Sequence, residues 1–304
     1  MTGYFDLQVN GYAGVDFNAD SLDDADFVRV CRRLANDGVD QILATIITAP
    51  IDTMIARIDR IARAMDEVDE VRRIIAGIHI EGPFISPVDG YVGAHPKSAV
   101  VPANADVADR LVGAGRGHIK MLTLAPESDP GGGVTGHLTD QGIVVAGGHS
   151  DASAEELDAA IDAGLALYTH LGNGCPASLP RHDNIIQRVL ARSDRLFISF
   201  IADGHHVPDF ALGNYFKCVP DDRIIIVTDA ISAAGLGPGN YSLGDQTVEV
   251  TDDGAAWSAD RTHFAGCATT MPKMGQILMH RIGASETQVK RWTQDNPHRL
   301  LFTR

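Results

Sequence analysis

The chain has 304 residues, of which 44% are hydrophobic and 21% charged, as in an ordinary globular protein. Its formal net charge of −15 argues against nucleic acid and anionic membrane surfaces as partners. The four cysteines form no CxxC motif, and the chain has no long apolar run. These features argue against a disulfide framework, a cysteine-bound zinc site, a signal peptide and a membrane span, and they predict a cytoplasmic protein.

The hydrophobic pattern predicts eight buried strands that mostly alternate with helices. The strands are expected at residues 5–10, 41–47, 74–80, 119–124, 142–147, 165–169, 196–202 and 223–229. The helices between them are expected at residues 21–38, 52–65, 106–113, 153–164, 185–192 and 208–217. Such an alternation predicts an α/β protein with a single domain, residues 1–304, folded as a parallel (β/α)8 barrel of the TIM type.

Local signals refine this pattern in the first half of the chain. Ser21, followed three residues later by Asp24, is the expected N-cap of the first helix. The stretch 83–102, which holds His95, predicts a long and therefore functional loop. The glycine-rich stretch 128–136 predicts a turn.

The pattern changes after the eighth strand. Residues 241–264 alternate between apolar and polar side chains around turn signals such as Gly244-Asp245, which predicts a β-hairpin insertion. Two helical segments, 271–282 and 285–293, are expected to close the chain.

A polar side chain stands at the exit of four predicted strands. These residues are Glu81, His149, His170 and Asp229. Because the carboxyl ends of barrel strands meet at one face, we expect the four side chains to lie together. A carboxylate and two imidazoles can hold a catalytic zinc ion that activates water, and Asp229 could then transfer a proton from the water to a leaving amine. One buried histidine is often only a structural hydrogen-bonding group, but the set of four predicts a metal-dependent hydrolase.

Weaker candidates lie in predicted loops on the same face. They are His95, Asn173, Arg181 and His206. Arginine suits planar recognition of carboxylate or phosphate, although a loop arginine is more often a solvated charge. Cys175 and Cys267 have no activating histidine nearby in the sequence, and we interpret them as packing residues.

Taken together, these motifs resemble the N-acetylglucosamine-6-phosphate deacetylases of the amidohydrolase superfamily. The matching segments occur in the family's order at residues 6–11, 79–84, 93–95, 148–150, 169–171 with 173, 202–207, 228–230, and 265–266 with 271. The resemblance implies that Glu81, His149 and His170 bind one divalent metal ion, zinc. It also implies that Asp229 is the catalytic acid/base, and that His95 contacts the sugar and polarises the amide carbonyl.

The resemblance also implies a substrate and a partner. The expected substrate-binding residues are Ala94, His95, Asn173, Gly174, Arg181, His206, Ala265 and Gly266. In this family a neighbouring subunit supplies part of the phosphate pocket, which implies a homodimer. Gln8 and Asn10 stand where many amidohydrolases carry a metal-binding His-x-His pair, so the chain resembles the single-zinc branch. The family's small β-sandwich domain has no counterpart in this sequence.

Some residues depart from the family pattern around the expected pocket. Residues 172–175 read Gly-Asn-Gly-Cys in place of an aromatic residue, Asn, Ala and Met, His205 replaces an apolar residue, and Cys267 replaces a serine. The leading hypothesis is a deacetylase of N-acetylglucosamine 6-phosphate or a related N-acetylated sugar. The alternatives are an amidohydrolase that acts on a different amide and a non-catalytic sugar-binding barrel.

Overall fold

The barrel predicted from the sequence is present in the structure, a computed structural model that describes residues 3–243, 246–258, 261 and 264–303. Eight parallel strands form one sheet in the order β1-β4-β5-β6-β7-β8-β9-β10. The sheet closes where Val9, at the end of β1, pairs with Ala230, just after β10. The eight strands are β1 Tyr4–Val9, β4 Val39–Ile47, β5 Ile75–Glu81, β6 Ile119–Leu124, β7 Val144–Gly147, β8 Leu167–Tyr168, β9 Phe197–Ile201 and β10 Ile224–Val227.

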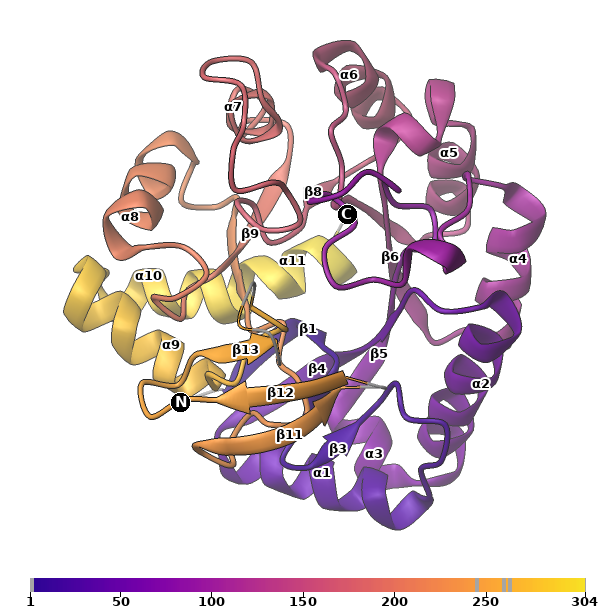
Figure 1. Cartoon of the computed structure of the whole chain (residues 1–304). Helices are drawn as coiled ribbons and strands as arrows, with labels where there is room; N and C mark the ends of the chain where they lie inside the picture. Colours follow the sequence, from indigo (N-terminus) through magenta and orange to yellow (C-terminus); the bar gives the residue numbers. More distant parts are fainter. Residues whose placement is uncertain (1–2, 244–245, 259–260, 262–263, 304) are drawn as a thin grey trace.

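The strands are mostly apolar because both of their faces are covered. Every residue of β7, β9 and β10 is buried, as expected for parallel strands with side chains inside the barrel and helices outside it. The helices form the outer ring seen in Figure 1. They are α1 Asp24–Asn36, α2 Ile51–Glu67, α3 Asp69–Ile74, α4 Ala105–Ala114, α5 Gly133–Asp140, α6 Ala154–Asp162, α7 Ile185–Leu190 and α8 Asp209–Cys218.

The predicted N-cap of the first helix is wrong by two residues. Asp23 is the N-cap of α1, and its side chain accepts a hydrogen bond from the backbone N–H of Asp26 at 2.9 Å. The side chain of Asp26 in turn accepts from the N–H of Asp23 at 3.2 Å. This reciprocal arrangement is a capping box. The sequence offers two overlapping pairs with the spacing of a capping box, Ser21 with Asp24 and Asp23 with Asp26, and the structure uses the second.

The predicted turn at 128–136 is also wrong, because helix α5 begins inside it. Gly131 and Gly132 adopt left-handed φ values of 78° and 72°, which glycine tolerates without a Cβ clash. Asp129 then accepts hydrogen bonds from the N–H groups of Val134 and Thr135 at 2.9 and 2.8 Å. These bonds satisfy donors of the first helical turn, so a glycine-rich start is compatible with a helix.

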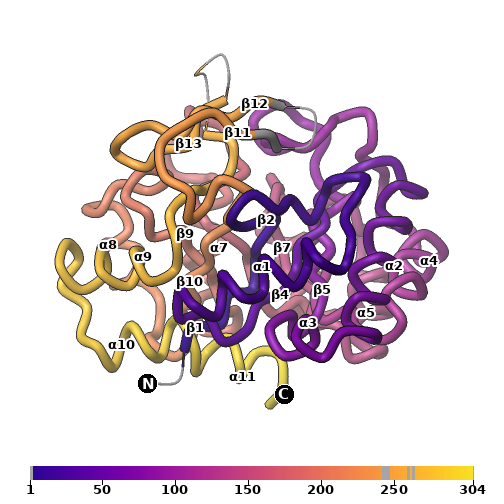
Figure 2. Tube along the Cα trace, turned by 90° about the horizontal axis from the view of Figure 1, so that it is seen from below, coloured from indigo at the N-terminus to yellow at the C-terminus, as the bar shows by residue number. Residues whose placement is uncertain are grey.

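The insertion after β10 is a three-stranded antiparallel sheet rather than a simple hairpin. Its strands are β11 Gly239–Leu243, β12 Gln246–Val250 and β13 Ala256–Ser258. The expected turn at Gly244-Asp245 lies outside the described residues. Figure 2 shows this sheet at one end of the barrel and both chain ends at the other, so the insertion covers the end where most of the predicted site residues lie.

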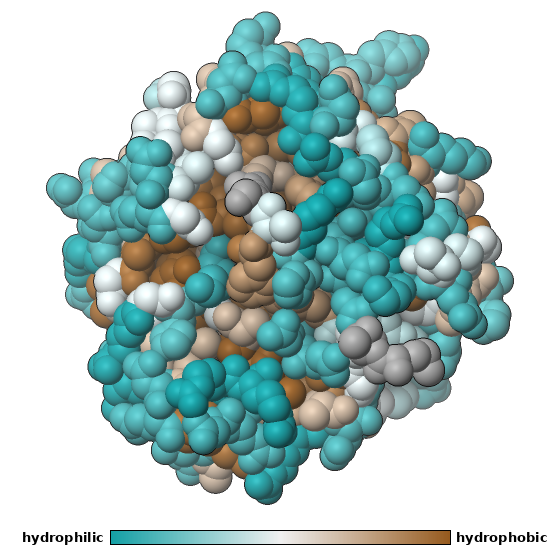
Figure 3. Space-filling model, turned by 180° about the vertical axis from the view of Figure 1, so that it is seen from behind, coloured by the Kyte–Doolittle hydropathy of each residue, from teal (hydrophilic) through white to brown (hydrophobic). Residues whose placement is uncertain are grey.

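The first C-terminal helical segment has the predicted bounds, 271–282, and the second extends further than predicted. Helix α9, Met271–Ile277, continues as a π-helical turn, and α10, Glu286–Lys290, continues through a second π-helical turn into α11, Asn296–Phe302. Phe302 stacks on Phe5 of β1 with ring centroids 6.3 Å apart. Figure 3 shows the face that is turned away from the viewer in Figure 1. The periphery of this face is hydrophilic, and hydrophobic side chains are visible in the hollows nearer its centre. Within the described ranges, no helix is both long and apolar enough to cross a bilayer.

Candidate active site

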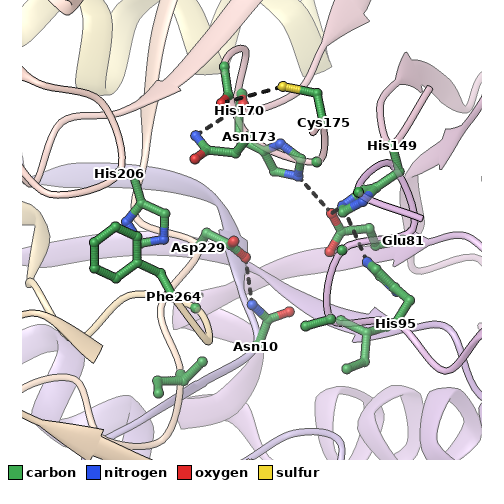
Figure 4. Close-up of a pocket in the computed structure, with 18 of the residues that line it drawn as sticks. Asn10, Glu81, His95, His149, His170, Asn173, Cys175, His206, Asp229 and Phe264 are labelled. Atoms are coloured by element: carbon green, nitrogen blue, oxygen red, sulfur yellow. Dashed lines mark hydrogen bonds and ion pairs between the residues drawn. The ribbon is translucent and has the colours of Figure 1, made fainter. Parts of the chain in front are cut away.

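A cavity of about 670 Å³ opens at the carboxyl ends of the strands. Four of its side chains come from strand ends far apart in the sequence, and Figure 4 shows them converging. Glu81 is the last residue of β5, His149 and His170 follow β7 and β8, and Asp229 follows β10. The structure therefore brings together the four residues predicted from the strand ends.

The backbone at three of these positions is strained. His149, His170 and Asp229 have positive φ values of 51°, 32° and 53°, in a region that residues with a Cβ rarely occupy. Each such residue costs about 1 to 3 kcal/mol and persists only where the surrounding structure enforces it. Strain of this kind clusters at functional sites, and here it turns each side chain into the cavity directly after its strand.

One oxygen of Glu81 is the centre of the cluster. Its Oε1 lies 3.0 Å from Nε2 of His170, 3.3 Å from Nε2 of His149 and 2.8 Å from Nε2 of Gln8. Burial alone would raise the pKa of Glu81, but the contacts with His149 and His170 outweigh it and hold the pKa well below its ordinary value. Glu81 is therefore an ionised carboxylate in a buried site.

The hydrogen bonds of His149 define which of its nitrogens can bind a cation. Its Nδ1 lies 2.9 Å from the carbonyl oxygen of Tyr91, and because a carbonyl only accepts, Nδ1 carries the proton. Nε2 is therefore the ring nitrogen that could bind a cation, and it faces the Glu81 carboxylate at 3.3 Å. Nε2 of His95 lies 3.3 Å from Nε2 of His149. Burial lowers the pKa of His95 to about 3, so the His95 ring is neutral.

This donor set fits a divalent metal ion. A backbone carbonyl on Nδ1 is the usual second partner of a metal-binding histidine, and this leaves Nε2 of His149 facing the Glu81 carboxylate. Ligand atoms around a tetrahedral zinc lie roughly 3.4 Å apart, close to the 3.0 and 3.3 Å separations of the two histidines from Glu81. The ligand atoms of Glu81, His95 and His149 lie within 4.8 Å of one another. Nδ1 of His170 is buried and has no hydrogen-bond partner among the residues that the structure describes.

Asp229 lies beside this cluster as a separate carboxylate. Its Oδ1 accepts hydrogen bonds from Nδ2 of Asn10 at 2.7 Å and from Nε2 of Gln8 at 3.2 Å. Burial raises the pKa of Asp229, and the nearby charge of Glu81 raises it further. Two buried carboxylates of opposite pKa shift are suited to different roles, and the one with the raised pKa suits proton transfer.

Six of the predicted substrate-binding residues line the cavity and two do not. Those that line it are Ala94, His95, Asn173, Gly174, His206 and Gly266. Ala265 is fully buried in the apolar cluster beneath the insertion sheet, where its neighbours are other alkyl groups. Arg181 is exposed in the loop before α7 and is not among the residues that line the cavity.

The cavity also contains residues outside the predicted catalytic, metal-binding and substrate-binding sets. Trp257 and Phe264 come from the insertion, with ring centroids 4.3 Å apart. Cys175, interpreted as packing, is half-buried in the cavity wall. Asn10 lines the cavity as well. The alternating pattern of the insertion was the one signal for the aromatic pair, and it did not show that the insertion covers the barrel.

His206 belongs to a second buried group at the cavity edge. Its Nδ1 lies 2.6 Å from Oδ2 of Asp203, and the backbone N–H groups of His205 and His206 both donate to Oδ1 of Asp203 at 2.9 Å. The thiol of Cys267 lies 3.5 Å from Oδ2 of Asp203, and burial raises the pKa of this thiol well above its ordinary range. Asp203 therefore fixes the orientation of the His206 ring through Nδ1. The other ring nitrogen of His206, Nε2, remains available to the cavity.

A closed parallel barrel that gathers a carboxylate, three imidazoles and a separate aspartate at its carboxyl end is the architecture of the metal-dependent amidohydrolases. A comparison with models of protein families gives no match. Comparison with individual proteins gives relatives over nearly the whole chain. The N-acetylgalactosamine-6-phosphate deacetylase of Escherichia coli O157:H7 is 32% identical, covering 98% of this chain and 77% of the relative. The N-acetylglucosamine-6-phosphate deacetylase of Bacillus subtilis is 31% identical, covering 99% and 75%.

Solved structures agree with the sequence relatives. The N-acetyl-D-glucosamine-6-phosphate deacetylase of Mycobacterium smegmatis, in complex with N-acetyl-D-glucosamine-6-phosphate, superposes with a TM-score of 0.88 at 28% identity, covering 99% of this chain and 77% of that one. The enzyme of Thermotoga maritima gives 0.85 at 29% identity, covering 99% and 78%. The chain belongs to the N-acetylglucosamine-6-phosphate deacetylase family, a family of metal-dependent aminosugar deacetylases, and it spans about three quarters of the length of these relatives.

Proposed function

We propose that this chain hydrolyses the acetamide of N-acetylglucosamine 6-phosphate or of a closely related N-acetylated sugar phosphate. The observation that carries the proposal is the meeting of Glu81, His149 and His170 beside Asp229 in one cavity. The names of the relatives support a phosphorylated aminosugar, and they include both the glucosamine and the galactosamine form.

Glu81, His149 and His170 would hold one divalent metal ion, for which we propose zinc. Such an ion would lower the pKa of water and polarise the amide carbonyl. Asp229 accepts a proton from the attacking water and donates it to the leaving nitrogen as the C–N bond breaks. His95, which is neutral because burial lowers its pKa to about 3, offers a ring N–H to the carbonyl oxygen and contacts the sugar.

The side chains of Gln8 and Asn10 support a single metal rather than a pair. Gln8 turns its amide N–H groups toward Glu81 and Asp229, and Asn10 turns its own toward Asp229. An N–H donor cannot coordinate a cation, so these amides stabilise the carboxylates by hydrogen bonds and do not offer ligand atoms to a second metal.

The charges in the cavity support a dimer. The described lining includes the carboxylates of Glu81 and Asp229 but no lysine or arginine, whereas a phosphate group needs cationic or N–H partners. We propose that His206 contacts the phosphate and that the exposed Arg181 completes the phosphate site of a second copy in a homodimer. Asn173, Gly174, Ala94 and Gly266 would contact the sugar.

Three further proposals concern the chain as a whole. We propose that residues 1–304 work as one domain, because the segment that follows the insertion sheet is bonded back to the barrel through the pairing of Ala230 with Cys267. The four cysteines are free thiols, which supports a reducing, cytoplasmic setting. The acidic net charge of −15 supports small-molecule substrates over nucleic acid.

The first experiment measures metal content and acetate release together. Protein purified with zinc present should hold about one metal per chain and release acetate from N-acetylglucosamine 6-phosphate. Metal without acetate release from either epimeric sugar phosphate would refute the substrate proposal.

For the dimer, inactive Arg181→Ala and Asp229→Asn variants are mixed after dissociation. Restored activity is expected if Arg181 serves the neighbouring site, and its absence in a proven mixed dimer would place Arg181 elsewhere.

A further inference from the structure

Asn10 and Gln8 both donate a hydrogen bond to Asp229 through their amide nitrogens. Their amide oxygens differ, because only one of the two accepts a hydrogen bond among the described residues. The Oε1 of Gln8 accepts a hydrogen bond from Oγ1 of Thr169 at 2.7 Å. Its Nε2 donates to Glu81 and to Asp229. The amide of Gln8 is therefore satisfied at both ends by the fold itself.

The amide of Asn10 is satisfied at one end only. Its Nδ2 donates to Oδ1 of Asp229 at 2.7 Å, and because a carboxylate only accepts, this bond fixes which end of the amide carries the nitrogen. The Oδ1 of Asn10 is buried and has no hydrogen-bond partner among the described residues. Figure 4 shows the nitrogen turned to Asp229 and the oxygen turned away.

A buried acceptor without a partner costs stability, because it loses its bond to water and gains none in return. An apolar side chain of the same shape would avoid that cost. The side chain of Asn10 is thus poorly explained by folding stability, and among the described residues the one group that it binds is Asp229.

The two amides leave Asp229 with one free oxygen. Oδ1 accepts from both Asn10 and Gln8, whereas within the described ranges no hydrogen bond is made by Oδ2. A carboxylate bound through one oxygen has its other oxygen aimed in one direction, and the barrier to proton transfer depends steeply on such alignment.

We propose that Asn10 is a positioning residue that aligns Asp229 for proton transfer through Oδ2, at a cost in folding stability. The proposal rests on the deacetylase function proposed above. In it, the proton leaves the attacking water for Oδ2 as the C–O bond forms, and it passes to the leaving nitrogen as the C–N bond breaks. Asp229 is returned as a carboxylate, still bound to Asn10 through Oδ1.

The test compares Asn10→Leu, Asn10→Asp and Gln8→Leu with the wild type, all metal-loaded. Asn10→Leu should lower kcat by roughly 10- to 100-fold with KM little changed, while its Tm stays within about 2 °C of the wild type or rises. Asn10→Asp keeps the shape but presents an oxygen to Asp229, and its kcat should fall at least as far. Gln8→Leu removes bonds that the fold uses, so its Tm should fall by roughly 5 °C or more.

Several outcomes would overturn the role of Asn10. An Asn10→Leu variant with wild-type kcat would show that Asp229 is aligned without it. A Tm loss in Asn10→Leu as large as in Gln8→Leu would make Asn10 a structural residue. A rise in KM with unchanged kcat would make it a substrate-binding residue. A wild-type protein that holds metal but releases no acetate would instead refute the proposed function, so the two failures can be told apart.

Discussion

Replacing Asp203 by asparagine should destabilise the fold by about 2 kcal/mol at neutral pH. Asp203 is 4% exposed. Its burial alone would raise its pKa, but the hydrogen bond and charge of His206 and two backbone N–H groups lower it from 3.8 to about 2. A carboxyl group whose pKa is lower in the folded state stabilises the fold above its unfolded pKa. That stabilisation is lost as the pH falls from about 4 to about 2.

The assay is urea unfolding of wild type and Asp203→Asn between pH 7 and pH 3. The difference in free energy of unfolding should be largest at pH 7 and shrink toward pH 3, with unchanged m values. The variant should also raise KM, because the ring of His206 faces the cavity. A matched control is Asp89→Asn, since Asp89 is 91% exposed in its pair with Lys97, and it should cost less than about 1 kcal/mol. A difference for Asp203→Asn that is absent at pH 7, or that does not change with pH, would refute the reasoning.

Three further changes test the site. Glu81→Ala should abolish metal binding, measured as metal per chain after gel filtration, and near-full occupancy would remove Glu81 from the ligand set. Asp229→Asn should keep its metal but lower kcat by about 10²- to 10⁴-fold, so near-normal turnover would contradict its role as acid/base. Gly266→Ala should lower the free energy of unfolding by about 1 to 3 kcal/mol, because φ is +71° and the new Cβ would lie 2.3 Å from Cγ2 of Ile231. Gly113→Ala, a helical position with nothing within 4 Å, is the matched control and should be neutral or slightly stabilising when both variants are unfolded in urea.

The central part of the site could be predicted from the sequence because a parallel barrel converts sequence order into position. Glu81, His149, His170 and Asp229 each follow an apolar run, and all strand exits in such a barrel face one end. The left-handed backbone at three of these positions could not be predicted. It comes from pairing of neighbouring strands and loops, not from the residues themselves.

The rim of the site could not be predicted in the same way. Trp257 and Phe264 reach the cavity because the insertion folds back over the barrel, where Nε2 of His205 meets the carbonyl oxygen of Asp253 at 3.1 Å. Arg181 belongs to the expected set but lies outside the cavity, since a loop side chain is placed by long-range contacts or by a partner. Helix α5 was missed for a related reason, because Asp129 supplies its hydrogen-bond acceptors from outside the helix.

The cavity divides into two ends, and this division bears on how the family varies its substrates. Figure 4 shows Glu81, His149 and His95 on one side of Asp229, and His206 with Phe264 on the other. In the proposed substrate the acetamide and the phosphate stand on opposite sides of the sugar ring, so an acetamide at Glu81 directs the phosphate toward His206. The hydroxyl that distinguishes glucosamine from galactosamine neighbours the phosphate arm. On the function proposed above, the hydroxyl that differs between the two sugars would lie at the end of the cavity formed by His206, Phe264 and Trp257.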